Sequence, residues 1–181
     1  DALTMAGLEL ESLDDPSERL REFVVAHVEK AEKHPDADRL KVCTVNNGTG
    51  IFEVVCGAPN VRAGMKGIFA GEGMYIPGID VTLKKSKIRG VTSNGMLLSE
   101  REMGLSDDHE GIVDLSDDAV VGTPAPQALG HNDPVIDIGV TPNRGDCLGV
   151  RGVARDLAAA GVGTLKPLEI EPVNGGFASP I

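Results

Sequence analysis

Residues 23–115 consist largely of short β-type runs separated by turns rich in Gly, Pro, Asn and Asp, and this succession limits the possible folds. Asn47-Gly48, between two such runs, is a strong hairpin signal. Several short strands at this spacing are typical of a small closed or partly open barrel, and frequent glycines suit its tight bends. The expected strands are 23–28, 40–45, 51–56, 67–70, 79–83, 88–98 and 112–115. The sequence therefore predicts a small closed or partly open barrel, an architecture that includes the five-stranded OB fold.

The two flanks have a different pattern. Residues 1–6 have the character of a helix end closed by Gly7, and 8–13 alternate as a half-buried strand does. A second strand is expected at 135–140, followed by a loop, Asp146 as N-cap and a helix from Cys147 to about Ala160. Because neither flank has enough apolar residues for its own core, we expect the two strands to pair.

These observations predict a mainly β chain with an α+β flank. The barrel, residues 21–127, is expected to be inserted into a small discontinuous α+β domain formed by residues 1–20 and 128–165. Residues 166–181 are expected to be an extended linker to a following domain. Because the chain opens without Met, inside an expected helix, we interpret it as a fragment.

The charge is distributed unevenly along the chain. The net charge is −11, which argues against a nucleic-acid partner because phosphate neutralisation supplies most non-specific affinity. Residues 23–105, however, contain eleven Lys and Arg against nine Asp and Glu, whereas the rest contains six against nineteen. The middle of the chain is therefore electrostatically distinct from its flanks.

The cysteines give no sign of catalysis or of a metal site. Cys43, Cys56 and Cys147 are odd in number and widely spaced, which favours buried free thiols in a reducing compartment. Their spacing to His34 and His109 matches no familiar zinc pattern, and neither a nucleophile–base pair nor a Walker motif is present. We therefore predict no catalytic residue, no metal and no cofactor within this chain, and we find no signal peptide or membrane span.

The best candidate for a binding surface is the basic stretch 84–89. Lys84, Lys85, Lys87 and Arg89 carry four positive charges with no acid between them, on an expected strand and loop of the barrel. OB folds present a sheet face and its bordering loops to oligonucleotides, where Lys and Arg meet phosphates. An alternative is a solvated edge strand that uses lysine against aggregation, and the residues alone favour neither.

Aromatic residues for stacking on bases are scarce. Phe23, Phe52 and Phe69 lie in strand-like runs where core packing is expected, and Tyr75 is the single tyrosine. Any RNA contact should therefore be weak and made mainly to phosphates. A DNA-reading helix with Arg151 and Arg155 is disfavoured because acids dilute its face, so we expect no DNA partner. For Arg144 we expect a surface ion pair.

Four motifs carry a resemblance to a known family. They are His34-Pro35-Asp36-Ala37-Asp38-Arg39-Leu40, Val55-Cys56-Gly57-Ala58-Pro59-Asn60-Val61, Lys87-Ile88-Arg89-Gly90-Val91-Thr92-Ser93-Asn94-Gly95-Met96 and Thr141-Pro142-Asn143-Arg144-Gly145-Asp146-Cys147-Leu148. The first three resemble the OB-fold tRNA-binding module of several aminoacyl-tRNA synthetases, and this resemblance implies that residues 21–127 form a five-stranded OB-type barrel. The whole series is similar to the amino-terminal part of bacterial phenylalanyl-tRNA synthetase β subunits.

This resemblance implies a non-catalytic part of a cytoplasmic ligase that joins phenylalanine to its tRNA. By resemblance the whole enzyme uses ATP and Mg²⁺ and assembles from two α and two β subunits, with the catalytic core in the α subunit. The implied partners are tRNA, the α subunit and a second β subunit. Two alternatives stay open: a free-standing tRNA-binding protein, and a purely structural assembly module that does not touch RNA.

Overall fold

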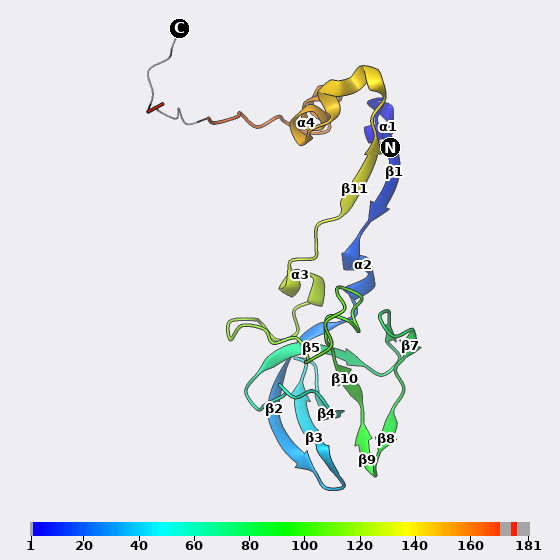
Figure 1. Cartoon of the computed structure of the whole chain (residues 1–181), viewed down its shortest axis with the longest axis vertical. Coiled ribbons are helices and arrows are strands. Elements are labelled where there is room, and N and C mark those ends of the chain that lie inside the picture. Colours follow the sequence, from blue (N-terminus) through cyan, green and yellow to red (C-terminus); the bar gives the residue numbers. More distant parts are fainter. Residues whose placement is uncertain (1, 171–174, 177–181) are drawn as a thin grey trace. The chain divides into compact units, whose positions relative to one another are not determined.

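The computed structural model describes residues 2–170 and 175–176 and divides the chain into two compact units (Figure 1). One unit comprises Asp14–Val135 and the other comprises Asp1–Leu13 with Ile136–Ile181. The predicted fold class, a mainly β chain built around an OB-type barrel, is confirmed. The boundaries of the two units lie between residues 13 and 14 and between residues 135 and 136. The sequence analysis placed the limits of the barrel domain between residues 20 and 21 and between residues 127 and 128. Part of the predicted linker, 171–174 and 177–181, lies outside the described residues.

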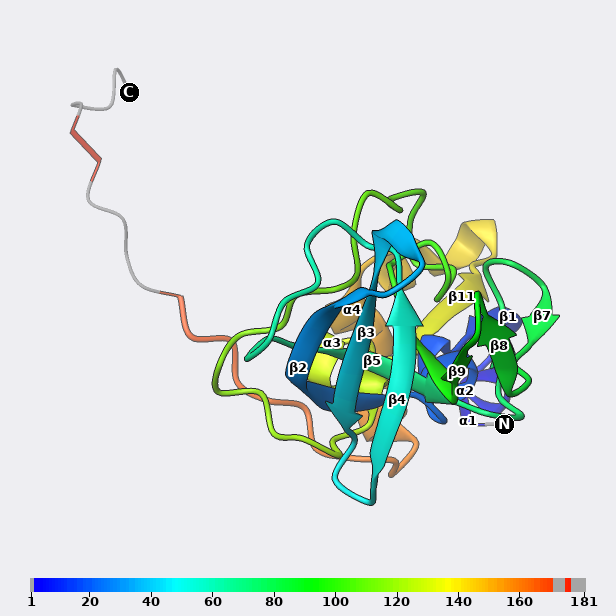
Figure 2. The same cartoon turned by 90° about the horizontal axis from the view of Figure 1, so that it is seen from below.

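The barrel unit is built on one five-stranded antiparallel sheet, in the order β10-β5-β2-β3-β4. Figure 2 shows β2, β3 and β4 side by side in a curved sheet. The outer strands approach each other, because the Asn94 amide donates to the Glu53 carbonyl at 2.8 Å and the Val55 amide donates to Ser93 Oγ at 3.1 Å. These bonds bring the sheet close to a closed barrel. Its strands are β2 (Val24–His34), β3 (Ala37–Asn46), β4 (Ile51–Cys56), β5 (Lys66–Gly71) and β10 (Gly95–Leu97).

The barrel encloses an aliphatic core with a single aromatic pair. The Phe52 and Phe69 rings lie 5.1 Å apart, and Phe69 is fully buried. Alternation along β3 and β4 places Cys43, Val45, Val54 and Cys56 inside, whereas β5 is buried along nearly its whole length. The other buried members of this core are Ala26, Val28, Cys43, Val45, Val54, Cys56, Val61, Met65, Leu97 and Ile112.

A glycine is required where β10 crosses Phe69. Gly95 has φ +153°, and a Cβ there would fall 2.5 Å from the Phe69 ring. Since real Cβ atoms are not found so close to a neighbour, only glycine lets β10 lie on β5 at this point.

A second core lies on the outer side of the sheet, under two short helices that the sequence analysis missed. Helix α2 (Pro16–Leu20) follows Asp15, whose side chain accepts the Ser17 amide at 2.9 Å as an N-cap. Helix α3 (Ala125–Leu129) ends at Gly130 in the left-handed conformation. Leu20 and Phe23 are buried against Ala125 in this core.

Three of the expected strands differ from the structure. The run 88–98 is divided between β8 (Ser86–Ile88), β9 (Val91–Ser93) and β10, because the chain reverses between β8 and β9. The run 79–83 contains only the short β7 (Val81–Thr82), paired with β6 (Tyr75–Ile76). Residues 112–115 form a loop with an isolated bridge between Lys66 and Leu115.

The second unit contains the strand pair expected from the flanks. Strand β1 (Glu9–Asp14) pairs with β11 (Val135–Gly139), and Leu8 is fully buried. A short helix α1 (Ala2–Met5) precedes β1.

The expected helix start in this unit is wrong. The 3₁₀ helix η1 (Pro142–Cys147) includes Asp146, and α4 (Val150–Ala159) begins only after Gly149, its N-cap. A Cβ on Gly152 would fall 1.8 Å from the Asp146 carbonyl oxygen, so the first turn of α4 packs closely on η1. None of the helices in the described part of the chain has the length and apolar character of a membrane span.

Candidate nucleic-acid interface

The predicted basic stretch forms the β8–β9 hairpin and the segment leading into it. Ile88 pairs with Val91, so Arg89 and Gly90 are the two turn residues, with φ of +47° and +89°. Two successive positive φ angles are the signature of a type I′ turn, whose twist matches that of paired strands. The hairpin is therefore a short, regular arm that carries its charges at defined positions.

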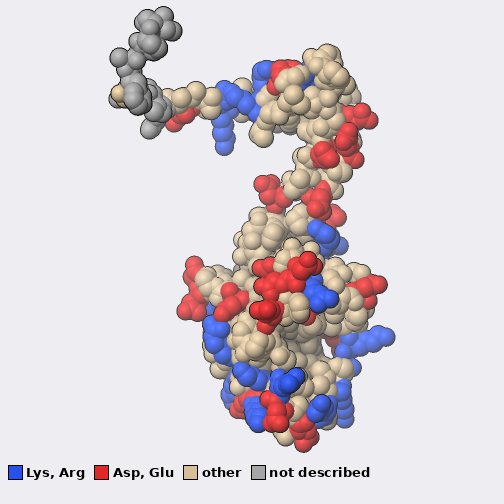
Figure 3. Space-filling view, viewed as in Figure 1, with Lys and Arg blue, Asp and Glu red and all other residues tan. Residues whose placement is uncertain are grey.

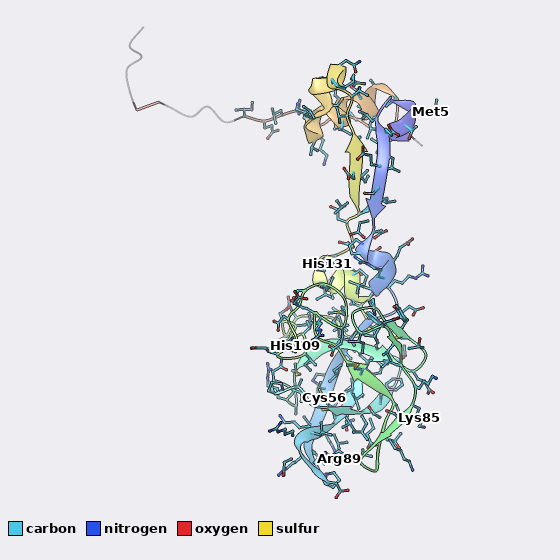
Figure 4. All side chains as sticks on the ribbon, turned by 45° about the vertical axis from the view of Figure 1, so that its right-hand side comes forward. Met5, Cys56, Lys85, Arg89, His109 and His131 are labelled. Atoms are coloured by element: carbon cyan, nitrogen blue, oxygen red, sulfur yellow. The ribbon has the colours of Figure 1, made fainter. Side chains whose placement is uncertain are left out.

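All four predicted residues are exposed on this arm. Figure 4 shows Lys85 and Arg89 on it. Among the described residues no carboxylate forms an ion pair with Lys84, Lys85 or Lys87. One acid lies close, because the Glu72 carboxylate accepts the backbone N–H of Lys85 at 3.4 Å. The structure thus brings the lysines together and places one negative charge beside them.

His34 fixes the hairpin to the end of β2. Its side chain is buried, with 2% exposed. The Asp36 amide N–H can only donate, and it lies 3.0 Å from Nδ1 of His34. The ring proton must therefore sit on Nε2, which donates to the Ile88 carbonyl at 3.1 Å. The sequence analysis assigned His34 no partner, because the motif around it carries no sign of a contact 54 positions away.

Arg89 makes a second link between the same two segments. Its guanidinium donates to the Asp36 carbonyl at 3.2 Å, so part of its hydrogen-bonding capacity is used within the protein. The remaining N–H groups are exposed and can meet a phosphate.

Further basic residues on the β2–β3 hairpin were not singled out from the sequence. Figure 3 shows Lys and Arg over the end of the barrel, mixed with Asp and Glu. Lys33 pairs with Asp38 at 2.7 Å, and Lys41 donates to the Val61 carbonyl at 2.6 Å. Lys30 and Arg39 are exposed. These basic residues are spread over two strands, so no continuous run of charges marked them in the sequence.

The aromatic residues take the positions expected from the sequence. Phe23 and Phe69 are buried, and Phe52 packs on the inner core. Tyr75 is half exposed and donates its hydroxyl to Asp80 at 2.9 Å, which raises the pKa of the tyrosine. The barrel therefore offers few stacking surfaces.

The cysteines are free and buried, as expected. Burial raises the pKa of the Cys43 thiol to about 12 and also raises that of Cys56. A neutral, buried thiol is a weak nucleophile.

A cluster of charged residues in the second unit was missed by the sequence analysis. Ligand atoms of Asp146, Cys147 and Asp156 lie within 4.8 Å of one another, a grouping that could hold a metal ion. Arg144 and Arg155 each bond both carboxylates, however, and lower the pKa of Asp146 to about 2. Two arginines already neutralise the two acids, so the arrangement is an ion-pair network rather than a metal centre. The ion pair expected for Arg144 is present within it.

Comparison with known proteins decides the family. The family described as "Putative tRNA binding domain" matches residues 23–124, more than half of the chain. The chain belongs to this family. The matched range covers the barrel and includes the β8–β9 hairpin.

The relatives agree with the resemblance found in the motifs. The chain is 58% identical over 179 residues to the phenylalanine–tRNA ligase beta subunit of Paramagnetospirillum magneticum, across 99% of its own length. It is 53% identical over 182 residues to that of Brucella melitensis. It spans 22% of the length of each of these curated relatives.

A solved structure, the MetRS related protein from Pyrococcus horikoshii, matches 57% of this chain and 87% of its own. The identity is 27% and the TM-score 0.41.

Proposed function

We propose that the barrel binds tRNA through phosphate contacts made by Lys84, Lys85, Lys87 and Arg89. One observation carries this proposal: Lys84, Lys85 and Lys87 are exposed on the β8–β9 hairpin and the segment leading into it, in a barrel of the tRNA-binding family, and form no ion pair among the described residues. Because His34 and Arg89 bond the hairpin to the β2–β3 turn, little conformational freedom remains to be lost on binding.

The phosphate contacts of this basic stretch should be weak and should position the RNA rather than read its sequence. Phosphate contacts carry no base information, and the exposed aromatic surface is small. Glu72 beside Lys85 and Asp38 on Lys33 reduce the local positive potential. Affinity should therefore fall with salt, by about 0.7–0.9 log units per log unit of salt for each phosphate neutralised.

We infer that the chain is the non-catalytic amino-terminal part of a phenylalanine–tRNA ligase β subunit. The high identity to such subunits over nearly the whole chain supports this inference. The complete protein would then work in the cytoplasm with ATP and Mg²⁺, and assemble with a catalytic α subunit and a second β subunit. The discontinuous unit, for which we proposed residues 1–20 and 128–165, would serve as scaffold.

A purely structural role is the second candidate. Arg89 donates to the Asp36 carbonyl and Lys33 pairs with Asp38. These bonds favour a structural role, because the two charges already stabilise the barrel. On this alternative the lysines protect a hairpin edge from aggregation.

A tRNA titration at low and moderate salt distinguishes the two roles. The variant Lys84→Ala/Lys85→Ala/Lys87→Ala should lower affinity and flatten the salt slope, while its unfolding free energy changes by less than about 0.5 kcal/mol per substitution. The control Arg21→Ala/Arg151→Ala/Lys166→Ala removes three exposed charges elsewhere and should leave the slope unchanged. Unchanged affinity and slope in the lysine variant would establish the structural role.

A further inference from the structure

A small pocket of about 280 Å³ lies beside the end of β4 in the barrel unit. Cys56 and the following Gly57-Ala58-Pro59 line one side, the end of β10 lines another, and residues 99–112 complete it. Cys56 and His109, both labelled in Figure 4, belong to its lining. None of the phosphate contacts proposed above uses this pocket.

The Asn60 side chain links the segment after β4 to residues 99–112 through two hydrogen bonds of the kind that join paired strands. The Asn60 amide donates to the Ile112 carbonyl at 2.7 Å, and its oxygen accepts the Ile112 N–H at 3.0 Å. A Cβ on Gly111 would fall 2.7 Å from the Asn60 side chain, so a glycine is required beside this clamp. The pocket is therefore preformed, which reduces the entropic cost of binding.

The charged group in the pocket is Glu102, and hydrogen bonds from the described residues reach only one of its two carboxylate oxygens. The backbone N–H and the hydroxyl of Ser99, which is buried, both donate to Oε2. Among the described residues no donor is bonded to Oε1. A carboxylate fixed through one oxygen offers the other as an oriented, charged acceptor.

His109 adds a second acceptor. Its Nδ1 lies 3.1 Å from the Asp107 carbonyl, which can only accept, so Nδ1 carries a proton. In the neutral ring, Nε2 is then an acceptor. A site with a negative charge and acceptors disfavours phosphate and favours a ligand edge that carries donors. The remaining walls, including Pro59, Met96 and the neutral Cys56 thiol, suit a flat apolar face.

We propose that this pocket binds one unstacked guanine base of the RNA. Guanine carries two adjacent donors, N1–H and the 2-amino group, and Glu102 Oε1 can accept from both as a shared acceptor. Adenine and cytosine place an acceptor beside their amino group, and the carboxylate would repel it. The proposal rests on the tRNA-binding function proposed above and adds base readout to the phosphate contacts proposed there.

Mononucleotides test the pocket directly. In the full chain, millimolar GMP should shift the NMR amide signals of Gly57 and Gly111. IMP, which lacks only the 2-amino group, should bind about tenfold more weakly, because one donor to a charged acceptor is lost. AMP should not shift these signals.

The variant Glu102→Gln replaces the charged acceptor of the pocket with a donor and keeps the hydrogen bonds to Ser99. Ser99 supplies two donors, so the Gln oxygen must face Ser99 and its NH₂ group must face the pocket. The preference for GMP over IMP should disappear, while the stability of the chain changes little. Glu100→Gln is the matched control, since Glu100 bonds Ser106 outside this pocket, and it should keep the preference.

Three results would overturn the proposal. They are equal binding of GMP and IMP, no shift at the pocket glycines with millimolar GMP, and shifts produced by acetyl-arginine amide instead, which would mark a site for a protein side chain. If the unaltered chain still binds tRNA in a salt-dependent manner in any of these cases, only the base pocket is wrong. If GMP binds the pocket but tRNA does not bind the chain, the proposed tRNA function fails instead.

Discussion

The imidazole Nε2 of His34 lies 3.1 Å from the carbonyl oxygen of Ile88, although the two residues are 54 positions apart in the chain. The same ring accepts the amide of Asp36, so one buried side chain joins the β2–β3 turn to the β8–β9 hairpin, beside the Arg89-Gly90 turn of that hairpin. The neutral ring with its proton on Nε2 satisfies both neighbours, and a second proton would leave the Asp36 N–H facing another donor.

Replacing His34 should therefore weaken both the barrel and its proposed RNA contact. In His34→Ala a buried side chain is lost and the Ile88 carbonyl and Asp36 amide lose their partners, which should cost about 1–3 kcal/mol of unfolding free energy. Because the hairpin also becomes more mobile, tRNA affinity should fall without loss of the lysines. Urea denaturation and tRNA titration measure the two effects. His131→Ala, at an exposed position, should change neither, and a stable His34→Ala variant with full affinity would contradict the link.

Gly95→Ala should destabilise the barrel by about 2 kcal/mol or more. The added methyl group would meet the Phe69 ring at 2.5 Å, and φ +153° is a conformation that L side chains rarely adopt. Thermal unfolding followed by circular dichroism checks this. Gly163→Ala provides the control, because a Cβ there meets no atom within 4 Å and no positive φ is involved. Equal melting temperatures for the two variants would show that β10 can move away from Phe69.

The pKa of the Asp146 carboxyl should be about 2, because Arg144 and Arg155 both bond the ionised form. The folded pKa is lower than the unfolded value of about 3.9, so this group stabilises the second unit at pH values above the unfolded pKa. That contribution is lost as the pH falls from about 4 to about 2. An NMR titration of the carboxyl carbon measures the midpoint.

Arg155→Ala should raise this midpoint toward the ordinary aspartate value, since one of the two guanidinium partners is removed. Arg151→Ala removes a charge from the same helix without a bond to Asp146, and it should leave the midpoint in place. An unchanged titration midpoint in Arg155→Ala would mean that the network is not formed in solution.

The thiols should react slowly with a disulfide reagent at pH 8 in the native chain. At a pKa of about 12, only about one Cys43 in ten thousand is a thiolate at this pH, and the side chain is fully buried. Unfolding in urea should expose all three cysteines to rapid reaction, which gives the reference rate in the same sample. Rapid labelling of Cys43 in the native protein would contradict its position in the barrel core.

The barrel and the flanking strand pair could be predicted because their signals are local. Strand Ile51–Cys56 was expected with the bounds that the structure has, since apolar alternation and the Asn-Gly turn mark it within a few residues. The β1–β11 pair followed from the shortage of apolar residues in each flank. The basic stretch 84–89 was equally visible in the sequence, because its four charges lie within six positions.

The tertiary structure decided what depends on partners far apart in the chain. The short α2 and α3 have little intrinsic stability and exist because Leu20 and Ala125 are buried in a shared core. The start of α4 was fixed by close packing of Gly152 on η1, and not by the local capping residue Asp146. His34 and Asp146 became parts of specific networks only when folding brought Ile88 and Arg155 within hydrogen-bonding distance. Such distances depend on the paths of several strands and loops, so a single sequence determines the strands and charges of this protein but leaves the partners of its buried polar groups to the folded chain.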